Sequence, residues 1–376
     1  MPKPFKTKPS QNLEICVIMP VKDEEETIIQ SLEALRFQKD GNDAPLSSDL
    51  YEVLVLANNC RDHTYVCIKE YQRNYPQFPL LVEEITFTEE EANVGTARRF
   101  LMDAACARFA SIHKNGIIAS TDGDTQVDEH WVRETLREMK KGCDVVGGEI
   151  ITHMEESATR QYHLHDIKYQ NLIARLESLI DPKTWNPWPS HFQCFGASFA
   201  ITCRMYEKAG RLPQVSCLED VAFLKALELK DAKIRRSPDV RVTTSARKIG
   251  RVEKGLSQQL AWFESLGNNQ EKQWVECADS IISRLKIRKS LFDLWEGRKL
   301  NYLQNLNDLQ HHFKGAMLKE WLDESGYFGE LWDKAQLELE RKHWFQQWES
   351  VEIEKALEDM EFYIAKTERS VRFKSS

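Results

Sequence analysis

The 376-residue sequence contains no long apolar run, no paired cysteine motif and no block of lysine and arginine. Its longest apolar stretches, at 15–20 and 53–57, are far shorter than the roughly 20 residues that a membrane-spanning helix needs, so we expect no transmembrane segment. The nine cysteines are scattered and none forms a CxxC pair, which argues against a disulfide framework and a zinc site. The basic N-terminus precedes no apolar segment, so we expect no secretory signal and a cytoplasmic location.

The composition is that of a globular protein. Hydrophobic residues make up 41% and charged residues 29% of the chain, with 16 glycines and 12 prolines, so the chain can bury a core. The net charge of −8 argues against a general affinity for nucleic acid. At roughly 100–200 residues per domain, the length predicts one large domain with an appendage, or two domains. We find no fixed-period repeat, which argues against a solenoid.

The first 150 residues alternate between apolar runs typical of strands and patterns with helical spacing. This alternation predicts an α/β fold of the Rossmann type, with a mainly parallel sheet flanked by helices. The predicted strands are 14–19, 52–57, 80–85, 116–120 and 144–151, and the helices between them are 27–37, 64–75, 94–112 and 129–140. Because ligands of such sheets bind beyond the carboxyl ends of the strands, the residues after each strand are the first candidates for a site.

The second half of the chain becomes progressively more helical. We expect a helix at 155–180, a proline-rich loop from 181 to 191, a strand at 198–202 and a helix at 220–229. Beyond residue 255 the pattern is almost entirely helical, with seven tryptophans in charged surroundings. We therefore divide the chain into a disordered lead-in (1–12), a sheet domain (13–254, with 155–195 on the acceptor side of any site) and a helical C-terminal region (255–376).

The strongest local motif is Asp122-Gly123-Asp124, directly after a predicted strand. Two carboxylates two residues apart at a strand end converge on one point, and such hard oxygen ligands hold Mg²⁺ or Mn²⁺ together with substrate phosphates. The alternative for this motif alone is a solvated turn before a helix.

Three further polar motifs follow predicted strands and would face the same crevice. The first strand ends in Pro20-Val-Lys22-Asp-Glu24, where the free amides of the first helix begin. The second strand ends in Asn58-Asn-Cys-Arg-Asp62, whose amide and carboxylate groups suit a base or a ribose. The third helix opens with Gly95 and Arg98, which permit close backbone approach and phosphate binding.

These motifs resemble, in the same order, those of the family 2 glycosyltransferases, which have the GT-A fold and use nucleotide sugars. The resemblance covers roughly residues 13–260 and includes Phe195 to Ser198, similar to the family's acceptor-side glycine motif, and Leu218 to Asp220, similar to its acidic pair with the general base. Segments 93–105, 186–191 and 245–251 look closest to a bacterial branch without membrane spans, often encoded beside a PIG-L-type deacetylase and a methyltransferase.

The sequence also departs from the family's pattern at two places. Asn58 and Asn59 stand where many members have two aspartates, which leaves open whether the nucleotide is UDP, GDP or another. Ser245, Arg247 and Lys248 stand where many GT-A enzymes place a metal-binding histidine, which favours cationic side chains taking over part of the metal's role.

The resemblance implies an inverting transfer of one sugar from a nucleoside diphosphate sugar to a hydroxyl group of a small or lipid-linked acceptor. It assigns the general base to Asp220, with Glu219 at the acceptor or sugar, and the Mn²⁺ or Mg²⁺ ion to Asp124 and Asp122. The predicted donor contacts are Pro20, Lys22, Glu24, Asn58, Asp62, Gly95, Arg98, Asp122, Gly123, Arg247 and Arg251, and the acceptor contacts are Trp188, His191, Gly196, Ala197 and Ser198.

Several alternatives stay open at this point. Trp188 can stack on a sugar or anchor its loop to the core, and His191 can line a pocket or lie on the surface. The C-terminal tryptophans are expected to pack the helical region onto the sheet domain, or else to form a self-association face or a membrane-surface face. The competing functions are a nucleotidyltransferase, and a degenerate relative that binds partners through its helical region.

Overall fold

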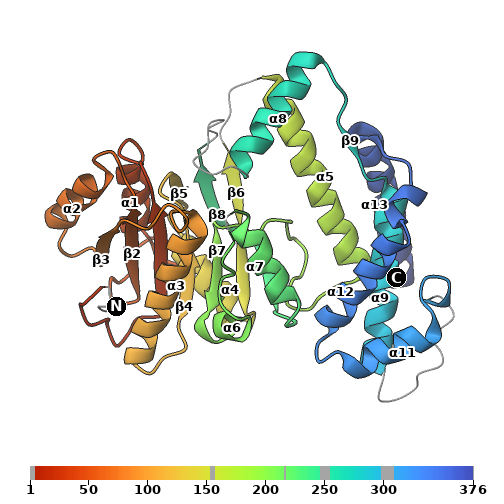
Figure 1. Ribbon diagram of the computed structural model, residues 1–376, viewed down its shortest axis with the longest axis horizontal. Helices are drawn as coiled ribbons and strands as arrows, with labels where there is room; N and C mark the ends of the chain where they lie inside the picture. Colours follow the sequence, from red (N-terminus) through yellow and green to blue (C-terminus); the bar gives the residue numbers. More distant parts are fainter. Residues whose placement is uncertain (1–4, 153–156, 216, 246–254, 298–308, 376) are drawn as a thin grey trace. The chain divides into compact units, whose positions relative to one another are not determined.

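The computed structural model describes residues 5–152, 157–215, 217–245, 255–297 and 309–375 (Figure 1). The chain forms two compact units. The sheet unit comprises residues 1–154, 193–227 and 232–259, and the helical unit comprises 155–192, 228–231 and 260–376. The division of the chain at 254/255 therefore differs from the two compact units in one main respect. The segment 155–192 belongs with the C-terminal helices and not with the sheet unit.

The sheet unit contains one eight-stranded sheet with the order β3-β2-β1-β4-β7-β6-β8-β5. The pairs β1–β2, β2–β3, β1–β4 and β6–β8 are parallel, whereas β7 runs antiparallel to both β4 and β6, and β5 runs antiparallel to β8. The strands are β1 (Ile15–Val21), β2 (Tyr51–Asn58), β3 (Leu80–Ile85), β4 (Ile117–Ser120), β5 (Thr125–Val127), β6 (Val145–Thr152), β7 (Phe199–Thr202) and β8 (Ile234–Thr244). The prediction of an α/β fold with a mainly parallel sheet is confirmed.

Helices cover both faces of this sheet, because alternate residues of each buried strand point to opposite sides. Ile15, Val17 and Met19 of β1 belong to one apolar core, which α1 (Ile28–Arg36), α2 (Thr64–Asn74) and α4 (Trp131–Lys140) complete. Cys16 and Ile18 belong to the other core, which α3 (Val94–Ser111), α6 (Cys203–Lys208) and α7 (Glu219–Glu228) complete. The sheet unit therefore has three layers, with the sheet between two layers of helices.

Residues 5–12 pack against the sheet unit. Phe5 is buried in the second core, and its carbonyl oxygen accepts a 2.8 Å hydrogen bond from Nη1 of Arg108 in α3. The Thr7 carbonyl accepts a second bond from the same nitrogen at 2.7 Å. The prediction of a disordered lead-in is thus wrong for residues 5–12, because a buried arginine and an apolar pocket hold this segment.

The helical unit consists of antiparallel and crossing helices with one short two-stranded sheet. In Figure 1, α5 and α13 run side by side, and the ion pairs Lys168–Glu361 and Arg175–Glu368 join them. Its elements are α5 (Ala158–Ile180), most of α8 (Leu256–Asn269), β9 (Trp274–Val275), α9 (Ala278–Gly297), α11 (Gly315–Glu324), α12 (Phe328–Arg341), η1 (Trp344–Gln347), β10 (Val351–Glu352) and α13 (Ile353–Ser375). Among the described residues, no helix is long and apolar enough to cross a membrane.

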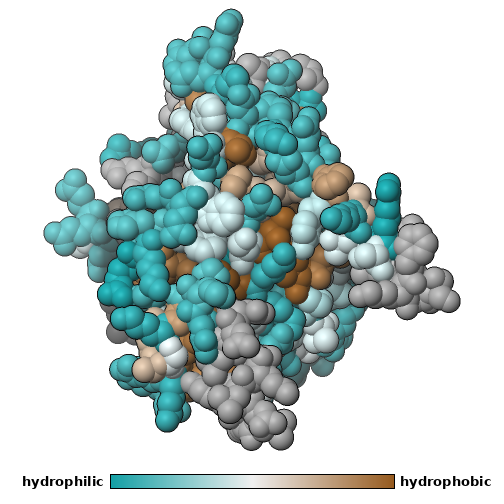
Figure 2. Space-filling view, turned by 90° about the vertical axis from the view of Figure 1, so that its right-hand side faces the viewer, coloured by the Kyte–Doolittle hydropathy of each residue, from teal (hydrophilic) through white to brown (hydrophobic). Residues whose placement is uncertain are grey.

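The C-terminal tryptophans pack mainly within the helical unit itself. Trp295 and Trp344 are buried in one core cluster, and Trp321, Trp332 and Trp348 pack against that cluster. Trp262 and Trp274 are instead exposed. The space-filling view in Figure 2 shows hydrophobic residues only in small groups among hydrophilic side chains. We expected these tryptophans to pack the helical region onto the sheet domain. The five tryptophans at 295, 321, 332, 344 and 348 instead contribute to a core within the helical unit.

Candidate active site

The ends of β1 and β2 are joined by carboxylates that accept backbone hydrogen bonds. Asp23 accepts the amide of Arg61 at 2.6 Å, and Asp62 accepts the amide of Glu25 at 3.1 Å. Thr64 links both strand ends, because its hydroxyl accepts the Glu24 amide at 2.7 Å and donates to Asp62 at 2.5 Å. Burial alone would raise the pKa of Asp62, but the bonds from Thr64 and Glu25 hold it below its ordinary value. Asp62 therefore shapes the loop first, whatever else it contacts.

The turn after β4 places Asp122 and Asp124 beside this junction. Gly123 lies between them with no room for a side chain, since a Cβ there would lie 2.7 Å from Cγ1 of Val21. Its carbonyl oxygen accepts a 2.9 Å hydrogen bond from the hydroxyl of Ser31 in α1. The turn is thus fixed against β1 and α1, and both aspartate side chains remain partly exposed.

The third motif opens α3. Asn93 caps this helix by accepting the Thr96 amide at 2.9 Å, as the extended backbone of a helix N-cap allows. Gly95 brings α3 close to the start of α7, because a Cβ on Gly95 would lie 3.2 Å from Cβ of Glu219. The start of α3 and the acidic pair 219–220 are therefore in close contact.

Arg98 connects these motifs. Its Nη2 donates to Oδ1 of Asp122 at 2.6 Å, and its Nη1 donates to Oε1 of Glu219. Burial opposes the charge of Arg98, but the carboxylates of Asp122, Glu219 and Asp220 raise its pKa above the ordinary value. Burial also raises the pKa of Asp122 to about 6; Arg98 opposes this rise, and Asp124, Glu219 and Asp220 reinforce it.

Asp220 is held at the opening of α7. Its Oδ2 accepts the backbone amide of Gly196 at 3.0 Å, and its Oδ1 accepts the amide of Val221 at 2.8 Å. The carbonyl oxygen of Gly196 accepts the hydroxyl of Ser120, the last residue of β4, at 2.9 Å. One peptide segment thus ties the acidic pair to the strand that carries Asp122.

Exposure separates the predicted site residues into two groups. Lys22, Asp62, Asp122, Asp124, Ala197 and Asp220 are partly exposed within the sheet unit. Pro20, Glu24, Asn58, Gly95, Arg98, Gly123, Gly196, Ser198 and Glu219 are buried. Other protein groups surround the buried side chains, so the structure leaves them little surface for direct contact with a donor or an acceptor.

Four of these residues have partners or surroundings that favour roles other than the predicted ones. Arg98 is engaged by Asp122 and Glu219, so it is not placed to bind a phosphate, and Glu219 is not placed to contact acceptor or sugar. Asn58 is buried at the end of β2, away from the solvent that a base or ribose would displace. The hydroxyl of Ser198 accepts Nε1 of Trp131 at 3.1 Å on the α4 side of the sheet, so it supports packing.

Two acceptor-side candidates belong to the helical unit. Trp188 is half-exposed, and the guanidinium carbon of Arg175 lies 4.5 Å from its ring centroid, which favours a cation–π contact. His191 is buried. Arg247 and Arg251, predicted to face the pyrophosphate, lie outside the described residues.

The residues at the β4 turn fit a divalent cation. Asp122 and Asp124 offer hard carboxylate oxygens from a turn whose central glycine is fixed by packing. Mg²⁺ commonly binds one or two carboxylates together with substrate phosphates, so two protein ligands suffice when the donor supplies the others. The three-residue clusters found among the described residues lie elsewhere, at Asp23–Cys60–Asp62 and Asp43–Glu129–His130.

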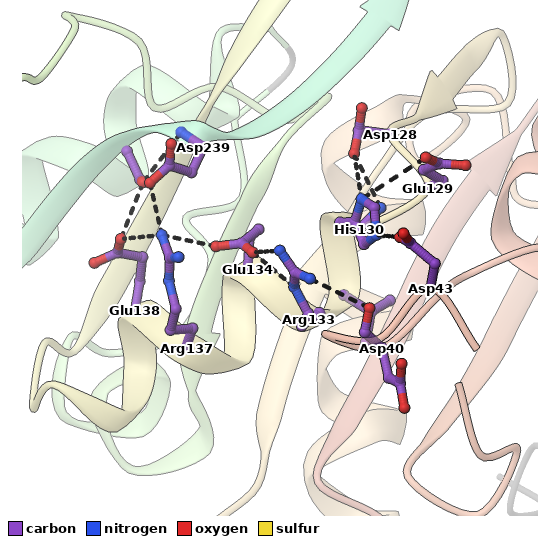
Figure 3. Close-up of polar contacts among 12 residues, drawn as sticks. Asp40, Asp43, Asp128, Glu129, His130, Arg133, Glu134, Arg137, Glu138 and Asp239 are labelled. Carbon is purple, nitrogen blue, oxygen red and sulfur yellow. Dashed lines mark hydrogen bonds and ion pairs between the residues drawn. The ribbon is translucent and has the colours of Figure 1, made fainter. Parts of the chain in front are cut away.

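A second charged cluster lies around α4 (Figure 3). Arg137 contacts Glu134 at 2.7 Å and Asp239 at 2.6 Å, while Arg133 donates to Glu134 and to the Asp40 carbonyl oxygen. A shallow hollow of about 220 Å³ is lined here by residues of α4 and β8, and its cationic side chains lie beside carboxylates that also line it. This balance of charge gives the hollow no net preference for an anion.

Sequence reasoning missed the hydroxyl groups that join the motifs. Thr64, Ser31 and Ser120 each hydrogen-bond a strand-end residue of a different segment. Ser31 occupies a position on the buried face of α1 together with Leu32 and Leu35, so a polar residue within an apolar stripe was the available signal. Thr64 and Ser120 carry no such signal, since both residue types are common at helix starts and strand ends.

Comparison with known proteins identifies the family. The family model described as glycosyl transferase family 2 matches residues 16–209, just over half of the chain and the part that carries Asp122, Asp124 and Arg98. No curated protein sequence matches significantly.

Among solved structures, the chain is similar to S. aureus TarS 1–349 in complex with UDP, with 14% identity over 82% of this chain and 78% of that chain and a TM-score of 0.43. It is also similar to the mannosyltransferase PcManGT from Pyrobaculum calidifontis in complex with GDP-Man and Mn²⁺, with 16% identity over 89% and 91% of the chains and a TM-score of 0.41. On the family match and its collinear motifs, this chain belongs to glycosyl transferase family 2.

Proposed function

We propose that this protein transfers a sugar from a nucleoside diphosphate sugar to an acceptor hydroxyl group, with inversion at the anomeric carbon. The observation that carries the proposal is the convergence of Asp122 and Asp220 on one buried arginine at the carboxyl end of β4, with Asp124 beside Asp122 on the same turn. A candidate metal site and a separate carboxylate would supply stabilisation of the leaving diphosphate and a general base, the two contributions that favour a single displacement.

The roles follow from exposure and hydrogen bonding. Asp124 and Asp122 would hold Mn²⁺ or Mg²⁺ against the donor pyrophosphate, and the bound ion would neutralise charge on the leaving diphosphate. Asp220, partly exposed and oriented by the Gly196 amide, would accept the proton of the acceptor hydroxyl. Holding donor and acceptor in line would supply much of the acceleration.

The donor class can be tested without a known acceptor. Thermal unfolding is measured with UDP, GDP, CDP and dTDP, each with and without Mn²⁺ or Mg²⁺. A ligand at about 100 times its dissociation constant stabilises the folded state by roughly 2.7 kcal/mol, which shifts the melting temperature by a few degrees. We expect a metal-dependent shift with one nucleotide, followed by slow hydrolysis of the matching nucleotide sugar, tried first with UDP-GlcNAc and GDP-mannose because similar structures contain these donors.

A matched pair of variants locates the metal. Asp124→Asn is expected to remove the metal-dependent part of the shift. Asp128→Asn changes a nearby aspartate that accepts the His130 amide just before α4, and should leave the shift intact. Absence of any nucleotide shift in folded wild-type protein would contradict the proposal and favour a role in binding partners. The anomeric configuration of the product, determined by NMR, tests inversion.

A further inference from the structure

The side chain of Arg98 is only 3% exposed, yet it binds carboxylates from two separate segments. Asp122 follows β4, and Glu219 opens α7, 97 residues further along the chain. The Nε–H of Arg98 has no hydrogen-bond partner among the described residues, and the two carboxylates accept hydrogen bonds from its two terminal nitrogens. Both carboxylates are therefore held relative to one another by one planar group.

The backbone around Arg98 is fitted to this arrangement. A Cβ on Gly196 would lie 2.5 Å from Nη1 and 2.6 Å from Cζ of Arg98, so only glycine can pass over the guanidinium. The amide of the same glycine binds Asp220. Any shift of the Arg98 head group would thus move both Glu219, through its ion pair, and Asp220, through Gly196.

We propose that Arg98 is a positioning residue that aligns the donor-side carboxylate Asp122 with the base-side pair Glu219–Asp220, without touching the donor. The proposal rests on the proposed function. It goes beyond that function in giving Glu219 a supporting role and in linking the two halves of the site through one side chain. A lysine at this position keeps the positive charge but reaches only one carboxylate at a time. The substitution therefore removes the alignment of the two carboxylates while the charge stays the same.

A second buried arginine on the same helix supplies the control. Arg108 binds both oxygens of Glu52, each at 2.6 Å, and the carbonyl oxygens of Phe5 and Thr7. It lies near the other end of α3, and the partners that the described residues give it, Glu52, Phe5 and Thr7, are outside the strand-end motifs. Arg98→Lys and Arg108→Lys therefore impose the same chemical change on two buried arginines, of which only one joins the site.

The experiment compares binding with turnover in the full-length protein. Folding is checked by circular dichroism and melting, the dissociation constant of the selected nucleoside diphosphate with Mn²⁺ by calorimetry, and kcat and KM by hydrolysis of the corresponding nucleotide sugar. For Arg98→Lys we expect kcat to fall about 100-fold, the effect of a misplacement near 1 Å, while the dissociation constant changes by less than about twofold. For Arg108→Lys we expect a lower melting temperature and an unchanged kcat.

Glu219→Gln tests the same link from the other end and serves if Arg98→Lys does not fold. We expect this variant to lower kcat at constant nucleotide affinity, and the double variant to be no slower than Arg98→Lys, because both changes break one linkage. Weaker nucleotide binding by Arg98→Lys at unchanged kcat would overturn the proposal in favour of a donor contact. A lower melting temperature at wild-type kcat and affinity would overturn it in favour of a purely structural role. A wild-type protein that neither binds nor hydrolyses any donor would instead overturn the proposed function itself, and the role of Arg98 with it.

Discussion

Two clusters of charged side chains lie in the sheet unit, and they differ in burial and in origin. The cluster around Arg98 draws its members from the β4 turn, from α3 and from the start of α7, and two glycines are packed against it. The cluster on α4 draws most of its members from one helix, through pairs such as Arg137–Glu134 at i,i+3 spacing. Its Arg137–Asp239 pair is about half exposed on both sides.

This difference shows that charge density does not by itself mark a functional site. Neighbouring charges on a helix follow from helical spacing alone, and exposed ion pairs contribute little free energy. Burying Arg98 with carboxylates from distant segments requires close backbone approach and an acidic partner for each of its two terminal nitrogens, which a surface cluster does not require. The comparison makes four predictions, of which the first two change matched residues in the two clusters and the last two each change one cluster.

The largest difference should appear when one aspartate is changed in each cluster. Asp220→Asn is expected to lower kcat by about 10² to 10⁴-fold, the usual contribution of a general base, while Asn can still accept the Gly196 amide. Asp239→Asn should leave kcat unchanged. Turnover of the nucleotide sugar by both variants is the measurement, and equal activity of Asp220→Asn and wild type would remove Asp220 as the base.

A glycine-to-alanine change in each cluster compares packing. Gly196→Ala places a methyl group against the buried guanidinium of Arg98, and overpacking of this kind costs about 1–3 kcal/mol of unfolding free energy. Gly41→Ala places the same group 3.8 Å from Nη1 of Arg133, an ordinary contact, and should change stability by less than about 0.5 kcal/mol. Urea unfolding of the two variants tests this prediction. Equal unfolding midpoints for the two variants would mean that the loop at Gly196 shifts to accommodate the methyl group at little cost.

The pKa of Asp122 predicts a pH-dependent difference in the metal-free protein. Because the folded-state pKa, about 6, lies above the ordinary value of 3.8, the folded protein binds this proton more tightly than the unfolded chain does. The contribution of Asp122 is therefore fully present below about pH 4 and is lost as the pH rises through 6. Asp122→Asn cannot lose it, so its melting temperature relative to wild type should increase between pH 4 and pH 7. A constant difference would contradict the raised pKa.

The smallest effect is expected for the exposed pair on α4. A double-mutant cycle of Arg137→Met and Asp239→Asn should give a coupling below about 1 kcal/mol, because both side chains are half exposed. Chemical unfolding of the four proteins measures it. A larger coupling would mean that the two clusters are energetically more alike than their burial suggests.

The strand-end geometry could be predicted because it depends on local pattern. The strand at Leu80–Ile85 and the helix from Val94 agree with the structure, since apolar periodicity sets both. β8 was missed because Arg235, Arg236 and Pro238 interrupt its apolar alternation, although pairing with β6 holds it in the sheet. Pairing with β6 determines that this segment is a strand, and a local sequence pattern carries no information about such pairing.

The motifs of the site were predictable, but the burial of their side chains was not. Arg98 was expected to meet phosphate because arginine near a helix start commonly does. Its burial depends on Gly196 and on Glu219, both about 100 residues away in sequence, whose approach follows from the position of β7 between β4 and β6. The same distance explains the error at Ser198, whose partner Trp131 comes from α4.

The interleaving of the two units has a consequence for how the chain folds. The chain passes between them at residues 154, 192, 227, 231 and 259, so neither unit is one continuous segment. α5 is synthesised long before its partners, since Tyr169 and Leu176 pack against Ile281 of α9 and Met360 of α13. The apolar face of α5 therefore stays exposed while about a hundred further residues are synthesised. During this time the exposed apolar surface favours aggregation or chaperone binding. A chain that ends at residue 254 would leave that face uncovered permanently.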